Sequence, residues 1–496
     1  MVILSSIILR KESLLKQYIS NVITEQEIGD WKNGDKILIH AQTGSGKSYF
    51  IKNTLYDYCK SRDKTILLLS NRIILKAQNE VDLEGKLSII HPENYQKLES
   101  EMLSGAYIDE LFSGYDIIVY DEAHYLFSDS QFNRNTDLLI EPIKKSYPDK
   151  IFIFCTATPD ALVNYYADFD RLYTIPFDYH YVNNIYFYNK SETVDQIISN
   201  IPQDEKIIFF SSNAFDAFQV MNTHNDSTFI CSKDNKSFGK KSNPKTIHEI
   251  VNYNTFYSKI LCTTKVLDNG VNIIDKSVKH IIIDMLDPIS LVQCIGRKRI
   301  VDEDDQITLY VKNYHGGNLY AQVEELNKRL NFVKELESLG AEGFQAKYKK
   351  KEFDSIIQND FTINKSKLVH YKTMRQFYLT MLGDRDKIGY KKVVCDMLYQ
   401  HDREFFSAEN KFEKSNLDEI LQNLVGVQLF GEEIEKFKNI FFSNIFSSKR
   451  VDYRKRGILC VNAILKEDSL PYKVTSGRGR KKSNRDKWFW VVEKDD

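Results

Sequence analysis

The segment that decides the fold is Ala41-Gln-Thr-Gly-Ser-Gly-Lys-Ser48. It follows the apolar run Lys36–His40, and a helix-compatible stretch continues from it to Lys60. A strand, a glycine-rich turn and a helix in this order place backbone N–H groups around an anion. A chance glycine turn is the alternative, and the flanking strand and helix disfavour it. The sequence therefore predicts a phosphate-binding loop, in which Ala41 replaces the glycine that begins the general pattern.

The side chains of this loop suit a nucleotide with its metal. Gly44 and Gly46 let the backbone curl round a phosphate, Lys47 can reach the terminal phosphates, and Ser48 can hold Mg²⁺. The predicted ATP-binding residues of the loop are Thr43, Gly44, Ser45, Gly46, Lys47 and Ser48.

A second motif, Asp121-Glu-Ala-His124, ends the apolar run Ile117–Tyr120. A carboxylate at the carboxyl end of a strand in a doubly wound sheet faces the ligand crevice. We expect Asp121 to bind the Mg²⁺ shell and Glu122 to polarise the attacking water. Alone, the motif could be the start of a surface helix, but the phosphate loop upstream argues against that reading. Together the two motifs predict an ATP hydrolase.

The wider pattern predicts an α/β protein with two tandem, doubly wound parallel sheets. Its 496 residues allow about three domains. Short apolar runs alternate with amphipathic stretches up to about residue 315, as buried parallel strands and their crossover helices do. The expected domains are a first α/β domain at 1–176, a second at 177–315, a mainly helical region at 316–446 and a small basic module at 447–496.

Composition excludes several classes of protein. The net charge is -1, so any basic surface is local. The seven cysteines include no CxxC pair, which disfavours zinc sites and disulfide frameworks and suits a reducing compartment. The apolar N-terminus is too short to span a bilayer and has no basic leader. The expectation is a cytoplasmic protein without a membrane partner.

Further motifs follow in an order that resembles superfamily 2 helicases of the DExH (DEAH-box) group, of the phage, mobile-element or restriction-motor type. The resemblance covers about residues 35–315 and implies two RecA-like domains. In it, Ser70-Asn-Arg72 and Tyr95-Gln96 are similar to nucleic-acid contacts of the first domain. His124 and Thr156-Ala-Thr158 resemble the elements that couple hydrolysis to domain movement.

The second domain continues the resemblance. Phe210-Ser-Ser-Asn213, which contains Ser212, and Thr264 are similar to nucleic-acid contacts, while Asp268 and Gly270 resemble residues that touch the nucleotide. Gln293-Cys-Ile-Gly-Arg-Lys-Arg299 resembles the motif with the arginine finger. The family has its second arginine where this chain has Ile300. The finger is therefore either Arg299, after a local shift, or Arg297 in a larger role.

The last part of the chain lies outside the resemblance and is basic. Residues 449–487 contain thirteen Lys or Arg and four Asp or Glu. We predict a winged-helix-like or hairpin module with a helix at Gly457–Leu465 and a strand at Trp488–Val492. In it, Trp488 and Trp490 share one buried face, and nucleic acid is contacted by Arg478, Arg480, Lys481 and Lys482. The C-terminal region is also the expected place for protein partners.

The leading interpretation is an ATP-dependent helicase or translocase that requires Mg²⁺ and acts on nucleic acid, with DNA favoured. An RNA helicase of the same group is the first alternative. The second is an ATP-controlled clamp, or a motor subunit of a larger complex, that hydrolyses ATP without unwinding by itself.

Overall fold

The structure is a computed structural model that forms two compact units, Met1–Asn184 with Gln203–Arg403 and Ile185–Pro202 with Glu404–Asp496. Each unit is described by itself. Residues 406, 440, 443 and 467 are described by their backbone alone. The described residues are 18–71, 83, 85–177, 179–233, 235–265, 271–349, 355–383, 389–398, 406–408, 417–418, 420–443, 457–467, 470–479 and 487–495.

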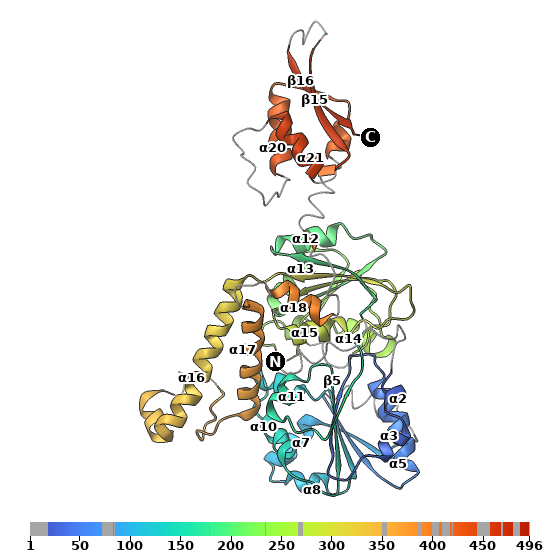
Figure 1. Ribbon diagram of the computed structural model, residues 1–496, viewed down its shortest axis with the longest axis vertical. Coiled ribbons are helices and arrows are strands. Elements are labelled where there is room, and N and C mark those ends of the chain that lie inside the picture. Colours follow the sequence, from blue (N-terminus) through green and yellow to red (C-terminus); the bar gives the residue numbers. More distant parts are fainter. Residues whose placement is uncertain are drawn as a thin grey trace. The chain divides into compact units, whose positions relative to one another are not determined.

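The first sheet of unit 1 is parallel, in the order β3-β2-β4-β5-β1-β6. Its apolar strands are buried on both faces, which explains their nearly continuous hydrophobic sequence. Figure 1 shows α2, α3 and α5 on one side of this sheet and α7, α8, α10 and α11 on the other. The strands are β1 Lys36–His40, β2 Ile66–Ser70, β3 Ile90–Asn94, β4 Ile117–Asp121, β5 Ile151–Thr156 and β6 Arg171–Thr174.

Two apolar clusters, one on each face, hold these helices to the first sheet. The helix after the phosphate loop runs from Lys47 to Lys60, as predicted, but its middle part, Phe50–Leu55, is π-helical. The other helices of this domain are α2 Ile19–Val22, α3 Glu25–Gly29, α7 Tyr95–Leu103, α8 Ile108–Phe112, α9 Tyr125–Ser128, α10 Thr136–Lys144 and α11 Asp160–Tyr165, with a 3₁₀ turn η2 at Asp129–Gln131.

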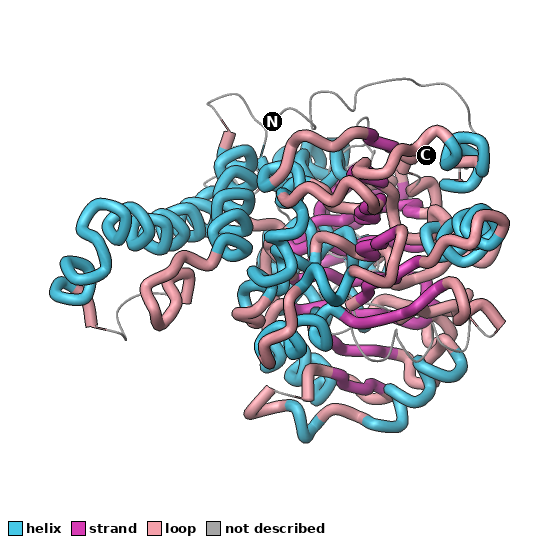
Figure 2. The backbone as a smooth tube through the Cα atoms, turned by 90° about the horizontal axis from the view of Figure 1, so that it is seen from below, coloured by secondary structure: helices cyan, strands magenta, loops and turns pink. Residues whose placement is uncertain are grey.

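The second sheet of unit 1 is also parallel and contains β12, β11, β8, β10 and β9 side by side in that order. Figure 2 shows strands of the molecule with helices along both sides. The two parallel sheets confirm the predicted tandem, RecA-like fold class. The elements are β8 Lys206–Ser211, α13 Ala214–Thr223, β9 Ser227–Ile230, η3 Gly239–Lys241, α14 Pro244–Tyr253, β10 Ile260–Thr263, β11 Val278–Asp284, α15 Pro288–Ile295 and β12 Ile307–Lys312.

Three helices follow the second sheet, α16 Gly316–Lys347, α17 Lys365–Leu382 and α18 Gly389–Met397. Figure 1 shows α16 and α17 side by side. Helix α17 also packs on α9, α10 and α11 of the first domain. The Ser366 N–H donates to Asp137 Oδ1 at 2.9 Å, and Asn164 Nδ2 donates to Thr373 Oγ1 at 2.9 Å. The helices after the second sheet therefore return to the first.

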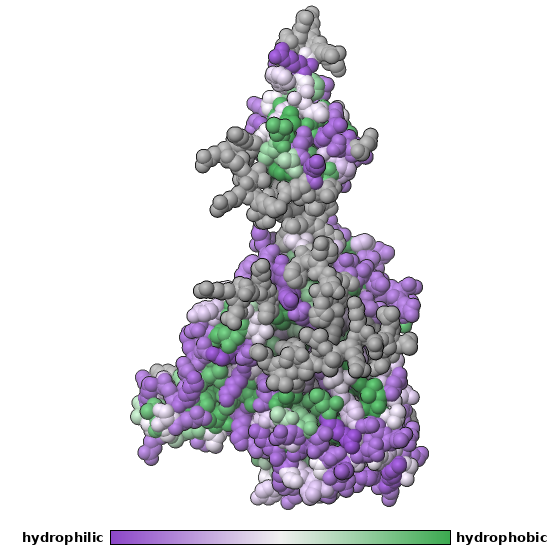
Figure 3. All heavy atoms as spheres, viewed as in Figure 1, coloured by the Kyte–Doolittle hydropathy of each residue, from purple (hydrophilic) through white to green (hydrophobic). Residues whose placement is uncertain are grey.

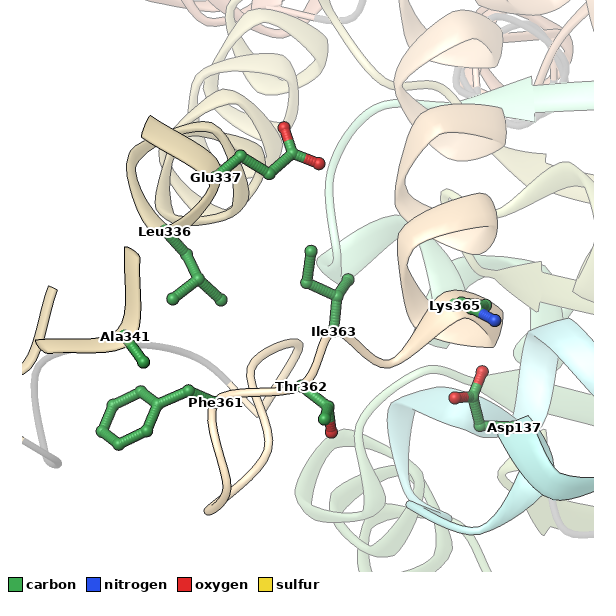
Figure 4. A pocket seen from close by; sticks show the side chains of 8 residues that line it. All are labelled: Asp137, Leu336, Glu337, Ala341, Phe361, Thr362, Ile363 and Lys365. Atoms are coloured by element: carbon green, nitrogen blue, oxygen red, sulfur yellow. The ribbon is translucent and has the colours of Figure 1, made fainter. Parts of the chain in front are cut away.

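A shallow cavity of about 590 Å³ lies between α16 and the start of α17 (Figure 4). Leu336, Phe361 and Ile363 give it an apolar wall. At its rim Lys365 pairs with Glu141 at 2.5 Å. This cavity contains none of the residues that the sequence nominates for catalysis.

Unit 2 contains a three-stranded antiparallel sheet in the order β14-β16-β15. Helix α21, Ile458–Glu467, and strand β16 confirm the predicted helix and strand of the basic module. The remaining elements are the Ile185–Tyr188 part of β7 Val182–Tyr188, α12 Glu192–Ser199, β13 Phe406–Ser407, β14 Gln428–Phe430, α20 Glu432–Ser443, β15 Tyr472–Arg478 and β16 Trp488–Lys494.

One prediction for this module is wrong, because Trp488 is 59% exposed instead of buried. Trp490 lies on the same face of β16 and packs against the apolar core of unit 2. Strand β14 pairs with β16 only as far as Phe489, so the strand continues past its neighbour at Trp488. Within the described residues, no helix has both the length and the apolar character that crossing a bilayer requires.

Candidate active site

The phosphate loop, Ala41–Ser48, joins β1 to the helix that begins at Lys47. Gly44 has φ +89° and Gly46 has φ +88°, values that side-chain-bearing residues rarely adopt. The Ser45 hydroxyl donates to the Gln42 carbonyl at 2.7 Å, which closes the turn. The loop therefore has the backbone shape that its two glycines predicted.

Lys47 is buried, and its ammonium is held by two oxygens. It lies 3.2 Å from Glu122 Oε1 and donates to the Ala41 carbonyl at 3.3 Å. A buried ammonium needs such partners because losing hydration costs more than a single contact returns. The sequence-predicted lysine and glutamate are thus brought together at the carboxyl ends of β1 and β4.

Glu122 follows β4 in a left-handed conformation, with φ +52°. Such a conformation is strained for a residue other than glycine and directs the side chain towards the phosphate loop. Its Oε2 lies 3.4 Å from His124 Nδ1 but accepts no hydrogen bond from the described residues. Burial opposes ionisation, but the charges of Lys47 and Arg297 outweigh it and lower the pKa of Glu122. Glu122 is therefore an anion at neutral pH.

Asp121 is the last residue of β4, and its backbone carbonyl accepts the Tyr95 hydroxyl at 2.8 Å. Burial and the neighbouring Glu122 raise the pKa of its carboxyl to about 6. The neighbouring carboxyls of Asp121 and Glu122 repel each other when both are ionised, so the site favours a bound cation. Ser48, the other predicted metal ligand, is exposed on the adjoining helix.

The three predicted coupling residues lie together beneath Glu122. His124 Nδ1 is 3.3 Å from Thr156 Oγ1, and the Thr158 N–H donates to the same hydroxyl at 3.1 Å. Burial lowers the pKa of His124, although the Glu122 carboxylate opposes this shift. The carboxylate is thus connected, through one histidine, to the end of β5.

In the second domain, Gln293 and Arg297 hold each other on the buried helix α15 and the turn that follows it. Arg297 Nη2 donates to Gln293 Oε1 at 3.0 Å, and Nε donates to the Gln293 carbonyl at 3.1 Å. A third bond, from Nη1, reaches the Val271 carbonyl at 3.4 Å. The Nε, Nη1 and Nη2 atoms of Arg297 therefore all donate to protein oxygens.

Arg299 is oriented differently. Its Nε donates to Asn272 Oδ1 at 2.6 Å, and its Nη1 lies 3.2 Å from where a Cβ on Gly44 would be. Burial and the neighbouring Arg297 lower the pKa of Arg299 to about 10. Of the two arginines, Arg299 is the one whose guanidinium lies against the phosphate loop in these contacts.

The nucleic-acid residues predicted from the motifs are not brought into one contact network by the described structure. Gln96 Nε2 donates inward, to Asn71 Oδ1 at 3.2 Å and to the Tyr125 hydroxyl at 2.9 Å. Ser212 and Thr264 follow β8 and β10, neighbouring strands, so they lie at the same edge of the second sheet. Arg478 ends β15 in unit 2. The predicted residues Arg72, Asp268, Gly270, Arg480, Lys481 and Lys482 lie outside the described residues.

The sequence analysis missed the roles of two site residues. Tyr95 supports Asp121, and Asn272 orients Arg299. Asn272 lies two positions after Gly270, which resembles a nucleotide contact, so its polar side chain beside Ile273 was a usable signal. Tyr95 was expected only as part of a nucleic-acid contact, because its bond to Asp121 depends on how α7 packs beside β4.

No protein-family model and no curated protein matches this chain. Among solved structures, S. cerevisiae Dbp5 bound to RNA and ADP-BeF3 is 15% identical, with 57% of this chain and 79% of that chain covered and a TM-score of 0.42. Mss116p bound to ssRNA and AMP-PNP is 14% identical, with 58% and 68% covered and a TM-score of 0.43. The Escherichia coli DEAH/RHA helicase HrpB is 12% identical, with 60% and 42% covered and a TM-score of 0.41. These three likenesses are likenesses of chain fold, at 12–15% sequence identity.

Proposed function

We propose that this chain is an ATP-dependent nucleic-acid motor, a helicase or translocase, that hydrolyses ATP between its two parallel sheets. One observation carries the proposal. The turn Gly296–Arg299 of the second domain lies directly against Thr43 and Gly44 of the phosphate loop, while Lys47 and Glu122 face each other at the end of the first sheet. A hydrolytic site assembled from two domains couples chemistry to their relative movement.

The residues fit a nucleotide triphosphate with its metal. Thr43 Oγ1 and Glu122 Oε2 are buried polar atoms without a hydrogen-bond partner in the described structure, as expected where a ligand or its water completes the site. ATP with Mg²⁺ would supply the phosphoanhydride bond and the positive charge that draws the carboxylates together. The loop amides and Lys47 would hold the terminal phosphates, and Ser48 and Asp121 would hold the metal. Glu122 would orient the attacking water, because it is already ionised.

We assign the arginine finger to Arg299 and a positioning role to Arg297. Arg299 lies at Gly44, whereas Arg297 spends its donors on Gln293 and Val271. Burial, and after it the repulsion from Arg297, lowers the pKa of Arg299, and a phosphate beside the two guanidinium groups would relieve that repulsion.

We assign the nucleic-acid contacts to the carboxyl edges of the two sheets, at Gln96, Ser212 and Thr264, with Arg72 and the basic residues of unit 2 as further contacts. Asp268 and Gly270 would complete the nucleotide site. Closure of the two domains on ATP and their release after hydrolysis would move the strand. DNA is our preferred substrate, because the motif pattern resembles phage and restriction-type motors.

The proposal is tested by nucleic-acid-stimulated ATPase activity in Lys47→Ala and Glu122→Gln. Both variants should lose it, the first through phosphate binding and the second through water activation. Lys328→Ala and Glu337→Gln, exposed positions on α16, are the matched controls and should behave as wild type. Normal stimulated activity in either site variant would overturn the assignment.

Substrate and mode of action are separated by two further measurements. DNA and RNA strands of equal sequence compare the stimulation, and stimulation by RNA alone would replace DNA with RNA as the substrate. A strand-displacement assay with the purified chain compares a helicase with a clamp. ATPase activity without displacement, restored by a partner protein, would make the chain a clamp or motor subunit.

A further inference from the structure

We propose that Arg478 and Trp488 form a stacking platform in unit 2 that binds unpaired nucleic-acid bases. This deepens the proposed function and rests on it, since a motor on nucleic acid is what would present such bases. The pair, here called the Trp488 platform, lies where β15 ends and β16 begins, at the connected end of the hairpin that the two strands form.

The exposure of Trp488 is the first observation. Trp488 and Trp490 lie on the same face of β16, two residues apart. Trp490 is covered by α20. The ring centres of Phe437 and Trp490 are 6.3 Å apart, and Lys438 Nζ lies 4.9 Å from the ring centre of Trp490. Trp488 lies beyond this cover and is 59% exposed. Figure 1 shows the strands of the hairpin continuing past α20 and α21.

The partner of Trp488 is the second observation. Arg478 is its cross-strand neighbour, and its guanidinium carbon lies 5.1 Å from the centre of the indole ring. Arginine over tryptophan is a favourable cation–π pair, which holds the indole in a fixed orientation. A flat ring that is fixed before binding loses little entropy when a second ring stacks on it.

The basic stretch of sequence that joins Arg478 to Trp488 is the third observation. From Arg478 to Lys487, with both included, the sequence contains six basic residues and one acidic residue. Figure 3 shows hydrophilic residues at this end of unit 2, beyond the green hydrophobic core. Two of the three acidic residues in the first turn of α20 are engaged elsewhere. Glu433 accepts the Phe430 N–H at 2.9 Å, and Glu435 pairs with Lys438 at 2.8 Å.

An exposed aromatic ring in basic surroundings fits a single strand better than a duplex. Basic side chains attract the phosphates of either form, but only an unpaired base offers an accessible ring face. Stacking on an aromatic side chain contributes about 1–3 kcal/mol per base, which is about a 5- to 150-fold change in affinity. The ligand that we propose for the platform is therefore a single-stranded stretch of DNA or RNA.

The test uses the full chain and its own fluorescence. Its three tryptophans are Trp31, buried in the first domain, Trp490 and Trp488. A short single-stranded oligonucleotide should quench the emission of the wild type, of Trp31→Phe and of Trp490→Phe, but not that of Trp488→Phe. Quenching that persists in Trp488→Phe would overturn the proposal.

Affinity gives the second readout. Trp488→Ala should weaken binding of the oligonucleotide by about 5- to 150-fold, and Trp488→Phe should restore part of the loss. Leu459→Ala, an exposed apolar side chain on α21 of the same unit, is the matched control and should bind normally. An abasic strand of equal length should bind the wild type and Trp488→Ala equally. Equal losses for abasic and base-bearing strands, or unchanged affinity in Trp488→Ala, would overturn the platform.

Failure of the platform and failure of the proposed function give different results. If the strand stimulates ATPase activity while the Trp488 readouts are negative, the motor stands and the platform is wrong. If Trp488 is quenched and its substitution weakens binding, but no nucleic acid stimulates ATPase activity, the platform stands and the motor is wrong.

Discussion

Gly296 of the second domain lies so close to Thr43 of the phosphate loop that a Cβ on Gly296 would be 2.9 Å from the Cβ and Oγ1 of Thr43. Real Cβ atoms do not approach this closely, so the contact requires glycine. The Gly296 backbone is in the ordinary right-handed region, with φ -64°. A side chain at this position is therefore excluded by lack of space, and the backbone conformation would allow one.

A substitution of Gly296 by alanine should hold the two domains apart. Because the added methyl group meets a Cβ instead of a flexible chain end, we expect a loss of at least tenfold in ATP turnover with little change in melting temperature. Gly114→Ala, where a Cβ would meet nothing within 4 Å, is the control and should retain full activity. Wild-type turnover in Gly296→Ala would show that the contact is not needed for hydrolysis.

The two arginines of the same turn should separate in their phenotypes. Arg299→Ala should reduce the rate of a single ATP turnover by about 10³–10⁵, the usual effect of an arginine finger, and should melt as the wild type does. Arg297→Ala leaves Gln293 and Val271 oxygens without donors, which costs about 1–3 kcal/mol of stability for a buried acceptor. We therefore expect a lower melting temperature for Arg297→Ala. The reverse pattern in these two measurements would exchange their roles.

The fold was accessible from sequence because parallel strands are buried on both faces and read as apolar runs, such as Ile66–Ser70 and Ile151–Thr156. The phosphate loop could be predicted because its glycines and lysine act within one short stretch of sequence. The inward direction of Gln96 and the exposure of Trp488 were not. Both depend on which element covers a side chain, and period-two alternation gives the face of a strand without giving its cover.

A pH dependence of stability is expected from Glu99, which is 3% exposed on α7. Burial raises the pKa of its carboxyl to about 7, although a hydrogen bond from Asn133 Nδ2 at 2.7 Å opposes this. The unfolded chain deprotonates at lower pH than the folded one. Ionisation of Glu99 therefore costs the folded state no stability below about pH 4.5. The loss of stability grows as the pH rises towards 7 and is complete above 7.

Glu99→Gln removes this cost, so the variant should be more stable than the wild type at pH 8, by about 1–3 kcal/mol, and equally stable at pH 4.5. Thermal denaturation at the two pH values measures the difference. Glu337→Gln, an exposed position, should show no such dependence. A difference that is the same at both pH values would assign the effect to packing instead of ionisation.

The attachment of α17 to the first domain should depend on Asn364, which is fully buried and acts in two directions. Its Oδ1 accepts the Lys367 N–H at 2.8 Å and so caps α17, while its Nδ2 donates to the Arg134 carbonyl at 3.0 Å. Asn364→Ala loses the cap and the hydrogen bond to the Arg134 carbonyl, which together cost about 1–3 kcal/mol. Asn364→Ser can keep the cap but is too short for Arg134, so it should recover about 1 kcal/mol.

Hydrogen exchange separates the effects, because Asn364→Ala should expose amides across α17 and α10. Asn213→Ala, which removes the cap of α13 only, should expose α13 alone. Unchanged exchange across α17 in Asn364→Ala would show that the other contacts of the helix are sufficient to hold it.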